Sequence, residues 1–242
     1  MSKLLVVEGS NIGRGVFKEI LDANKEFEYV LTGTYKEAKQ ELSKTRYEFA
    51  VVDNNLKDAP NGEIIALLNK HNIAPIVYIQ ELDEDTFETF EGAQIAEYII
   101  KQQHHNAHQA MQRLQRLKEN KKTTILIVND SHIYNIYLKQ NLSLHKFKVI
   151  SANNNEEAQE KLKLHPEIAL MIVDDSKPYV NALSLIEETR LSKTSKEMKI
   201  LVLAEDANSY ETAKYLLRGA DDYIVKQFSR SEFYTRIYQN II

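Results

Sequence analysis

The sequence predicts an α/β protein of two tandem domains, each with a parallel five-stranded sheet in the doubly wound order 2-1-3-4-5. The first observation behind this prediction is an internal repeat. The segments "KLLVVEGS", "FAVVDNN" and "AEYIIKQ" recur in the same order, at nearly constant spacing, as "TILIVNDS", "LMIVDDS" and "DDYIVKQ". The second observation is that short apolar runs alternate with amphipathic stretches in each copy, which is typical of βα units. Right-handed crossovers leave few other topologies.

A strand is predicted wherever a short apolar run is bounded by polar or turn-forming residues. In the first copy these runs are 3–7, 27–32, 48–52, 74–79 and 96–100. In the second copy they are 124–128, 147–151, 168–173, 199–203 and 222–225. The stretches between them, and 103–119, are predicted to be helices. Because the charged stretch "KENKKTT" follows that last helix, the domains are placed at 1–120 and 121–242.

The composition excludes several classes of protein. The 242 residues include no cysteine, so disulfides, thiolate catalysis and cysteine-bound metals are excluded. The formal net charge of −4 offers no generally basic surface, so direct binding of nucleic acid is not expected. No window approaches the ~20 apolar residues of a membrane helix, and the start of the chain lacks a signal-peptide core. We therefore expect a soluble, cytoplasmic protein without membrane contact.

Polar residues follow the predicted strands at the edge where the carboxyl ends of parallel strands converge. In the second copy Asp130, Asp174 and Lys226 follow the first, third and fifth strands. Carboxylate oxygens and a nearby backbone carbonyl, placed at Ser176, would hold Mg²⁺, which needs few protein ligands. The metal and the lysine would neutralise a phosphoryl group moving to a carboxylate. The alternative is that Asp130 and Asp174 cap the following helices, each contributing ~1 kcal/mol.

Both copies resemble the receiver domains of two-component response regulators. The resemblance rests on "IVNDS", "IVDDSKP" and "RGADDYIVKQF" in the second copy and on "VVEGS", "VVDNN" and "EGAQIAEYIIKQ" in the first. It implies two flavodoxin-like (βα)5 domains with three kinds of site residue. These are the phosphoacceptors Asp174 and Asp53, the phosphoryl-contacting lysines Lys226 and Lys101, and the switch aromatics Tyr223 and Tyr98.

The two copies depart from the receiver pattern at different positions. Receivers carry two adjacent acids after the first strand, the second of them a direct Mg²⁺ ligand. The second copy has Asn129 and Asp130 there, which keeps this ligand, whereas the first has Glu8 and Gly9, so that Glu8 would have to reach the metal instead. The family's hydroxyl after the fourth strand is replaced by side chains that we assign as Gln80 in the first copy and Ala204 in the second. Asp174 is therefore the favoured acceptor, and Asp53 the second candidate.

The resemblance implies a regulatory module rather than an enzyme. It would receive a phosphoryl group from a sensor histidine kinase or a phosphotransfer protein. It would then control dimerisation, through the face formed by helix 4, strand 5 and helix 5, or an output such as a C-terminal diguanylate cyclase (GGDEF) domain. The alternative is a scaffold that is never phosphorylated and that dimerises or docks a partner.

Two further patterns bear on other functions. The glycines of "VVEGSNIGRG" are spaced somewhat like those of a phosphate-binding loop, which makes an NAD(P)-binding oxidoreductase a remote alternative. The predicted second strand, "FEYVLTGT", ends without the acid that would hold a ribose, and a single-domain oxidoreductase leaves the repeat unexplained. The stretch "QQHHNAHQ" places His104 and His108 on one helical face, which is more typical of a solvated surface than of a metal site.

Overall fold

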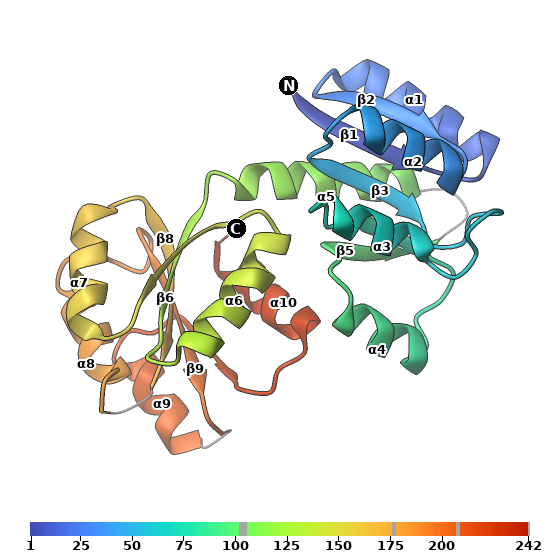
Figure 1. Ribbon diagram of the computed structural model, residues 1–242. Helices are drawn as coiled ribbons and strands as arrows, with labels where there is room; N and C mark the ends of the chain where they lie inside the picture. Colours follow the sequence, from blue (N-terminus) through green and yellow to red (C-terminus); the bar gives the residue numbers. More distant parts are fainter. Residues whose placement is uncertain (102–105, 176–177, 207–208, 242) are drawn as a thin grey trace. The chain divides into compact units, whose positions relative to one another are not determined.

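A computed structural model describes residues 1–101, 106–175, 178–206 and 209–241 of the chain (Figure 1). The chain divides into two compact units, Met1–Leu117 and Lys118–Ile242. Ser176, expected beside the acceptor, and the histidines His104 and His105 lie outside the described residues. Within the described part of the chain, no helix has the length and apolar character needed to cross a bilayer.

The first unit alternates strands and helices from its first residues onward. Its elements are β1 (Ser2–Val7), α1 (Asn11–Asn24), β2 (Phe27–Thr32), α2 (Tyr35–Lys44), β3 (Phe49–Asp53), α3 (Glu63–Lys70), β4 (Ile76–Ile79), α4 (Glu84–Gly92), β5 (Glu97–Ile100) and α5 (Asn106–Asn120). All strands pair in parallel in the order β2-β1-β3-β4-β5. This confirms the predicted strand order 2-1-3-4-5.

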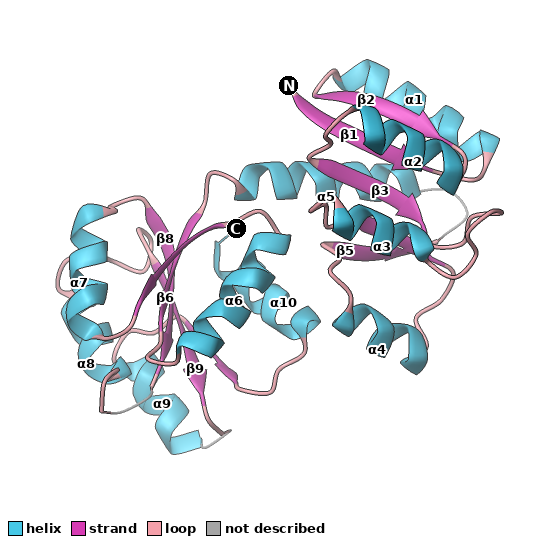
Figure 2. Cartoon of the chain, in the orientation of Figure 1, coloured by secondary structure: helices cyan, strands magenta, loops and turns pink. Residues whose placement is uncertain are grey.

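The second unit repeats this architecture (Figure 2). Its elements are β6 (Thr124–Val128), α6 (His132–Leu144), β7 (Lys148–Ala152), α7 (Asn155–Leu164), β8 (Ile168–Asp174), α8 (Ala182–Arg190), β9 (Lys199–Ala204), α9 (Ser209–Leu217), β10 (Asp222–Val225) and α10 (Arg230–Ile241). The strands pair in parallel in the order β7-β6-β8-β9-β10. Each unit is therefore a flavodoxin-like (βα)5 fold.

The central strands are apolar throughout because helices cover both faces of each sheet. All five residues of β6 are buried. Leu126 and Val128 pack into the core on one face, together with α8 and α9, whereas Ile125 and Ile127 pack into the core on the other face, with α6 and α10. Alternate residues of a strand point to opposite faces, so a continuous apolar run supplies both cores. The polar residues that follow the strands then lie together at one edge of the sheet.

Candidate functional site

The carboxyl edge of the second sheet holds an acidic pocket around Asp174. This residue ends β8, and its side chain is only 3% exposed. The Nζ of Lys226, just after β10, lies 2.8 Å from Asp174 Oδ2, and Asn129 Nδ2 donates a hydrogen bond to the same oxygen. Asp174 Oδ1 is buried without a hydrogen-bond partner among the described residues. One carboxylate oxygen is therefore held in place while the other is available for chemistry.

Asn129 replaces the first of the two expected acids with a buried amide. Its Nδ2 donates to Asp174, and its Oδ1 accepts the backbone N–H of Ser131 at 2.6 Å. Asn135 Nδ2 in turn donates to the Asn129 carbonyl at 2.7 Å. The amide is thus oriented by contacts on both sides. It positions the Asp174 carboxylate without adding a negative charge to the pocket.

The interpretation of Asp130 and Asp174 as helix caps is wrong. The cap of α6 is Ser131, whose hydroxyl accepts the backbone N–H of Tyr134. The cap of α8 is Asn181, whose side chain accepts a backbone N–H from the first turn of that helix. Both helix starts are therefore satisfied without Asp130 or Asp174, and both acids remain available for another role.

The charges of this pocket shift two pKa values. Burial raises the pKa of Asp174; Lys226 partly offsets this rise, and the nearby charges of Glu205 and Asp130 add to it. Burial lowers the pKa of Lys226, but its contacts with Asp174 and Glu205 outweigh burial, so the net shift is upward. Glu205 forms an ion pair with Lys226 although its own side chain is 72% exposed. Lys226 is therefore shared between Asp174 and the solvent-facing carboxylate of Glu205.

The first unit has an acidic pocket around Asp53, which is also buried. Lys101 Nζ lies 2.5 Å from Asp53 Oδ2 and 3.9 Å from Glu8 Oε2. The other oxygen of Asp53 accepts the backbone N–H of Asn55 at 3.2 Å. Beside these groups lies buried Tyr78, whose pKa is raised by burial and by the charges of Glu8 and Asp53. Unlike Asp174, Asp53 has both carboxylate oxygens engaged.

Glu8 and the neighbouring glycines form a local arrangement of their own. Glu8 Oε1 accepts the backbone N–H of Ser10 at 2.9 Å, so its side chain folds back over the start of α1. A Cβ added at Gly13 would lie 2.8 Å from Glu8 Cγ, whereas one added at Gly9 would meet nothing within 4 Å. Gly13 and Gly15 lie inside α1, not in a loop ahead of it. Gly13 therefore makes room for the side chain of Glu8. This close packing explains the glycine at position 13 without a bound dinucleotide.

The strand registers show that one predicted match between the two units, that of Gln80 with Ala204, is wrong. Lys101 N–H donates to the carbonyl of Ile79, and Lys226 N–H donates to that of Ala204. Ile79 pairs with Ile100 as Ala204 pairs with Val225. The counterpart of Ala204 is thus Ile79, and Gln80 lies one residue beyond the matching position. Exposed Gln80 lines a cavity of about 220 Å³ that also reaches Asp53. Neither Ile79 nor Ala204 carries a hydroxyl.

Tyr98 and Tyr223, the two tyrosines expected to act as switch aromatics, occupy matching places in their sheets. Tyr98 pairs with Val77 and Tyr223 pairs with Val202, each on the last strand of its unit. Both tyrosines are partly buried against the core of their own unit. The ring of Tyr98 stacks on Phe90 of α4, with the two centroids 6.1 Å apart. With Ile79 and Ala204 lacking a hydroxyl, the hydrogen bond that would draw these aromatics inward has no donor at that position.

The donor set of the second pocket fits a small divalent cation better than that of the first. Asp174 offers a buried oxygen without a partner, and the charge of Asp130 acts on the Asp174 pKa, so this second carboxylate lies within electrostatic reach. No group of three or more His, Asp or Glu side chains suited to a metal occurs among the described residues. Two carboxylates, a backbone carbonyl and waters suffice for Mg²⁺. In the first unit, Gly9 removes the counterpart of Asp130.

Known proteins resemble this chain in both sequence and structure. The family model "Response regulator receiver domain" matches residues 125–238. The chemotaxis protein CheY1 of Helicobacter pylori (strain J99) is 30% identical over 106 residues, which are 43% of this chain and 86% of that protein. The phosphate regulon transcriptional regulatory protein PhoB of Rhizobium meliloti is 30% identical over 114 residues, 47% of this chain and 49% of that protein.

Two solved structures match nearly the whole chain. One is a two-component system response regulator/GGDEF domain protein with a TM-score of 0.82 and 25% identity, aligned over 99% of this chain and 98% of the other. A second structure with the same description aligns over the same shares with a TM-score of 0.81 and 26% identity. Together with the acid and lysine pockets, these matches lead to one conclusion. The chain belongs to the response regulator receiver family, with two receiver-like (βα)5 units in tandem.

Proposed function

We propose that this chain is a regulatory module of two-component signalling that accepts a phosphoryl group on Asp174 in the presence of Mg²⁺. The observation that carries the proposal is the state of the Asp174 carboxylate. Lys226 and Asn129 hold Oδ2, while Oδ1 is buried without a partner among the described residues. A positioned carboxylate with one available oxygen, beside a lysine, is suited to attack phosphorus.

The chemical step requires few protein groups. An oxygen of the Asp174 carboxylate attacks phosphorus, a P–O bond forms, and the bond from phosphorus to the donor's leaving group breaks. With acetyl phosphate the leaving group is acetate, which departs with the electron pair. Lys226, whose Nζ is 2.8 Å from the carboxylate, neutralises charge on the arriving phosphoryl oxygens. Mg²⁺ held by Asp130 and Asp174 would supply the remaining charge neutralisation.

The proposal is tested by incubating the full chain with acetyl phosphate and measuring its intact mass. We expect a mass gain of one phosphoryl group in the presence of Mg²⁺, and none when EDTA removes the metal. Ca²⁺ at the same ionic strength is the matched control, because its larger size and longer bonds fit an octahedral Mg²⁺ site poorly. A folded chain that gains no mass with Mg²⁺ would contradict the proposal and favour the scaffold.

The Asp174 carboxyl is expected to titrate above the ordinary aspartate range. Burial raises its pKa. The folded chain therefore loses stability relative to the unfolded chain as the pH rises from the ordinary aspartate range through this raised pKa. As the pH falls towards that pKa, the carboxylate fraction declines and phosphorylation slows with it. Carboxyl-carbon NMR measures the titration directly. Exposed Asp58 is the control, because backbone N–H groups of Tyr35 and Lys36 lower its pKa. Asp174 titrating at or below Asp58 would contradict the expectation.

For the first unit we infer a docking or dimerising role rather than phosphorylation. Two differences from the second unit support this inference. Gly9 stands where the second unit has Asp130, and both oxygens of Asp53 are engaged. Loss of one carboxylate weakens metal binding, and without the metal the incoming negative charge is poorly compensated.

The partners follow from the same reasoning. A sensor histidine kinase or a phosphotransfer protein would supply the phosphoryl group. The phosphorylated state would favour a homodimer through the face of α9, β10 and α10, or act on an output such as a diguanylate cyclase. Leu216 and Leu217 at the end of α9 are 43% and 85% exposed, which is consistent with an apolar contact on this face. Sedimentation of the chain with and without acetyl phosphate measures whether a dimer forms.

A further inference from the structure

Tyr215 of α9 forms a hydrogen bond with Asp175, the residue that follows Asp174 in the chain. The hydroxyl of Tyr215 donates a hydrogen bond to Asp175 Oδ2 at 2.9 Å. The other carboxylate oxygen of Asp175 accepts the backbone N–H of Ala182, the first residue of α8, at 3.0 Å. One carboxylate, adjacent in the chain to Asp174, therefore joins the start of α8 to the last turn of α9.

The tyrosine side of this contact lies in the interior, whereas Asp175 is partly exposed. Tyr215 is only 4% exposed, and its ring packs in the core formed by α8, α9 and one face of the sheet. Removing the Asp175 carboxylate would leave the hydroxyl of this buried tyrosine without its acceptor. Burial raises the pKa of Tyr215, and the charges of Asp175 and Asp174 raise it further, so the hydroxyl remains a donor and lies within electrostatic reach of the acceptor.

We propose that the Tyr215–Asp175 hydrogen bond couples the acceptor site of the second unit to α9, in place of the missing hydroxyl at position 204. The inference rests on the proposed phosphorylation of Asp174. A phosphoryl group adds negative charge beside the Asp175 carboxylate and repels it. Because Asp175 is bonded to both helices, its displacement is transmitted to α9 as well as to α8. The phosphorylated and unmodified states therefore differ in a specific contact, as a conformational switch requires.

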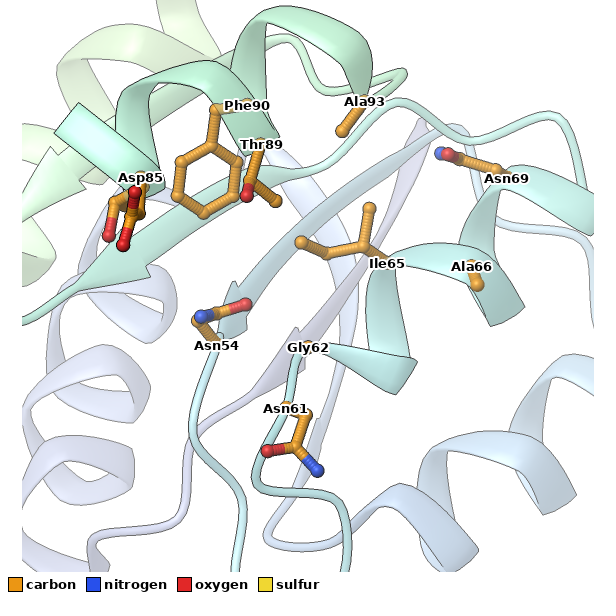
Figure 3. Close-up of a pocket in the computed structure, with 11 residues that line it drawn as sticks. Asn54, Asn61, Gly62, Ile65, Ala66, Asn69, Asp85, Thr89, Phe90 and Ala93 are labelled. Atoms are coloured by element: carbon orange, nitrogen blue, oxygen red, sulfur yellow. The ribbon is translucent and has the colours of Figure 1, made fainter.

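The first unit provides an internal comparison. The residue after its acidic strand is Asn54, and the α4 residue that matches Tyr215, eight positions before the switch tyrosine, is Phe90. Figure 3 shows these two side chains lining a cleft, with the Phe90 ring on α4. The cleft has a volume of about 410 Å³. A phenylalanine cannot donate a hydrogen bond, so the first unit lacks this connection.

The test uses the full chain, beryllofluoride with Mg²⁺ as the phosphoryl mimic, and hydrogen exchange resolved by mass spectrometry. In the wild type we expect the mimic to change amide exchange in α9 by about fivefold or more, in the range of typical coupling between sites. In Tyr215→Phe we expect the mimic to bind with an affinity within about fivefold of the wild type, and the exchange change in α9 to be lost. Asp175→Asn, which introduces the residue of the first unit, is expected to reduce the change in the same way.

Tyr210→Phe is the matched control, because Tyr210 lies on the same helix and is 68% exposed. It is expected to keep the full response. A response of α9 that persists in Tyr215→Phe would overturn the coupling, as would a wild type that binds the mimic without any change in α9. A wild type that behaves like Asp174→Asn and does not bind the mimic would overturn the proposed function, and the coupling with it.

Discussion

Replacing Asp174 with asparagine is expected to abolish the Mg²⁺-dependent mass gain from acetyl phosphate, while Asp53→Asn leaves it intact. The reason is chemical, because an amide oxygen is a poor nucleophile and cannot form the acyl phosphate. The two variants are matched, since both aspartates end the third strand of their unit beside a lysine. Intact-mass and peptide-level measurements locate the phosphoryl group. Equal labelling of both single variants would contradict the assignment to Asp174.

The stability of Asp174→Asn distinguishes lost chemistry from lost folding. Burial raises the pKa of Asp174, so near neutral pH its charge costs stability in the folded state. An asparagine of the same shape removes that charge, and its oxygen still accepts from Asn129 and Lys226. We therefore expect the variant to resist urea at least as well as the wild type. A marked loss of stability would mean that lost labelling reports unfolding.

Arg190→Ala is expected to destabilise the second unit by about 1–3 kcal/mol, the typical cost of leaving hydrogen-bonding groups without their partner. Arg190 Nη2 lies 2.6 Å from Asp221 Oδ2, and the two side chains are 15% and 8% exposed. The same guanidinium donates to the carbonyls of Gly219 and Met198 at 2.8 and 2.9 Å. Gly219 has a φ of 108°, which favours glycine, so the turn accommodates the arginine closely. Alanine would remove these contacts, while Lys199 Nζ, 3.1 Å from Asp221 Oδ1, would remain beside the partly buried carboxylate.

Urea unfolding followed by hydrogen exchange measures this loss in each unit separately. With a typical m value, the midpoint of the second unit should fall by about 1 M. Arg218→Ala is the control, because Arg218 pairs with Glu187 where both side chains are largely exposed (58% and 45%). Such surface pairs contribute about 0–1 kcal/mol. Similar shifts for the two variants would show that the Arg190 network contributes no more than a surface pair.

The fold could be predicted from the sequence because its signals are local and repeated. The runs "TILIV" and "FAVVD" are apolar throughout, as strands covered on both faces must be, and their recurrence indicated two copies of one domain. The convergence of Asp174 and Lys226 also followed, since the carboxyl ends of parallel strands share one edge.

Features that depend on register and on distant partners could not be obtained in this way. Ile79 and Gln80 are adjacent at the end of an apolar run, and only the pairing of β4 with β5 determines which one matches Ala204. A shift of one residue exchanges the two faces of a strand, and local composition does not resolve it. The sequence alone also leaves open whether Glu205 reaches Lys226 or faces away from it.

The sequence by itself determined two receiver-like domains, their strand order and an acid–lysine pair at the carboxyl edge of each sheet. Only the tertiary structure decided how each carboxylate is held. Asn129 and Lys226 hold one oxygen of Asp174, whereas both oxygens of Asp53 are engaged. The tertiary structure also revealed the hydrogen bond between Tyr215 and Asp175, which are 40 positions apart in the chain. The physical reason is that periodicity reports which face a residue occupies, while hydrogen bonding and burial depend on residues brought close only by folding.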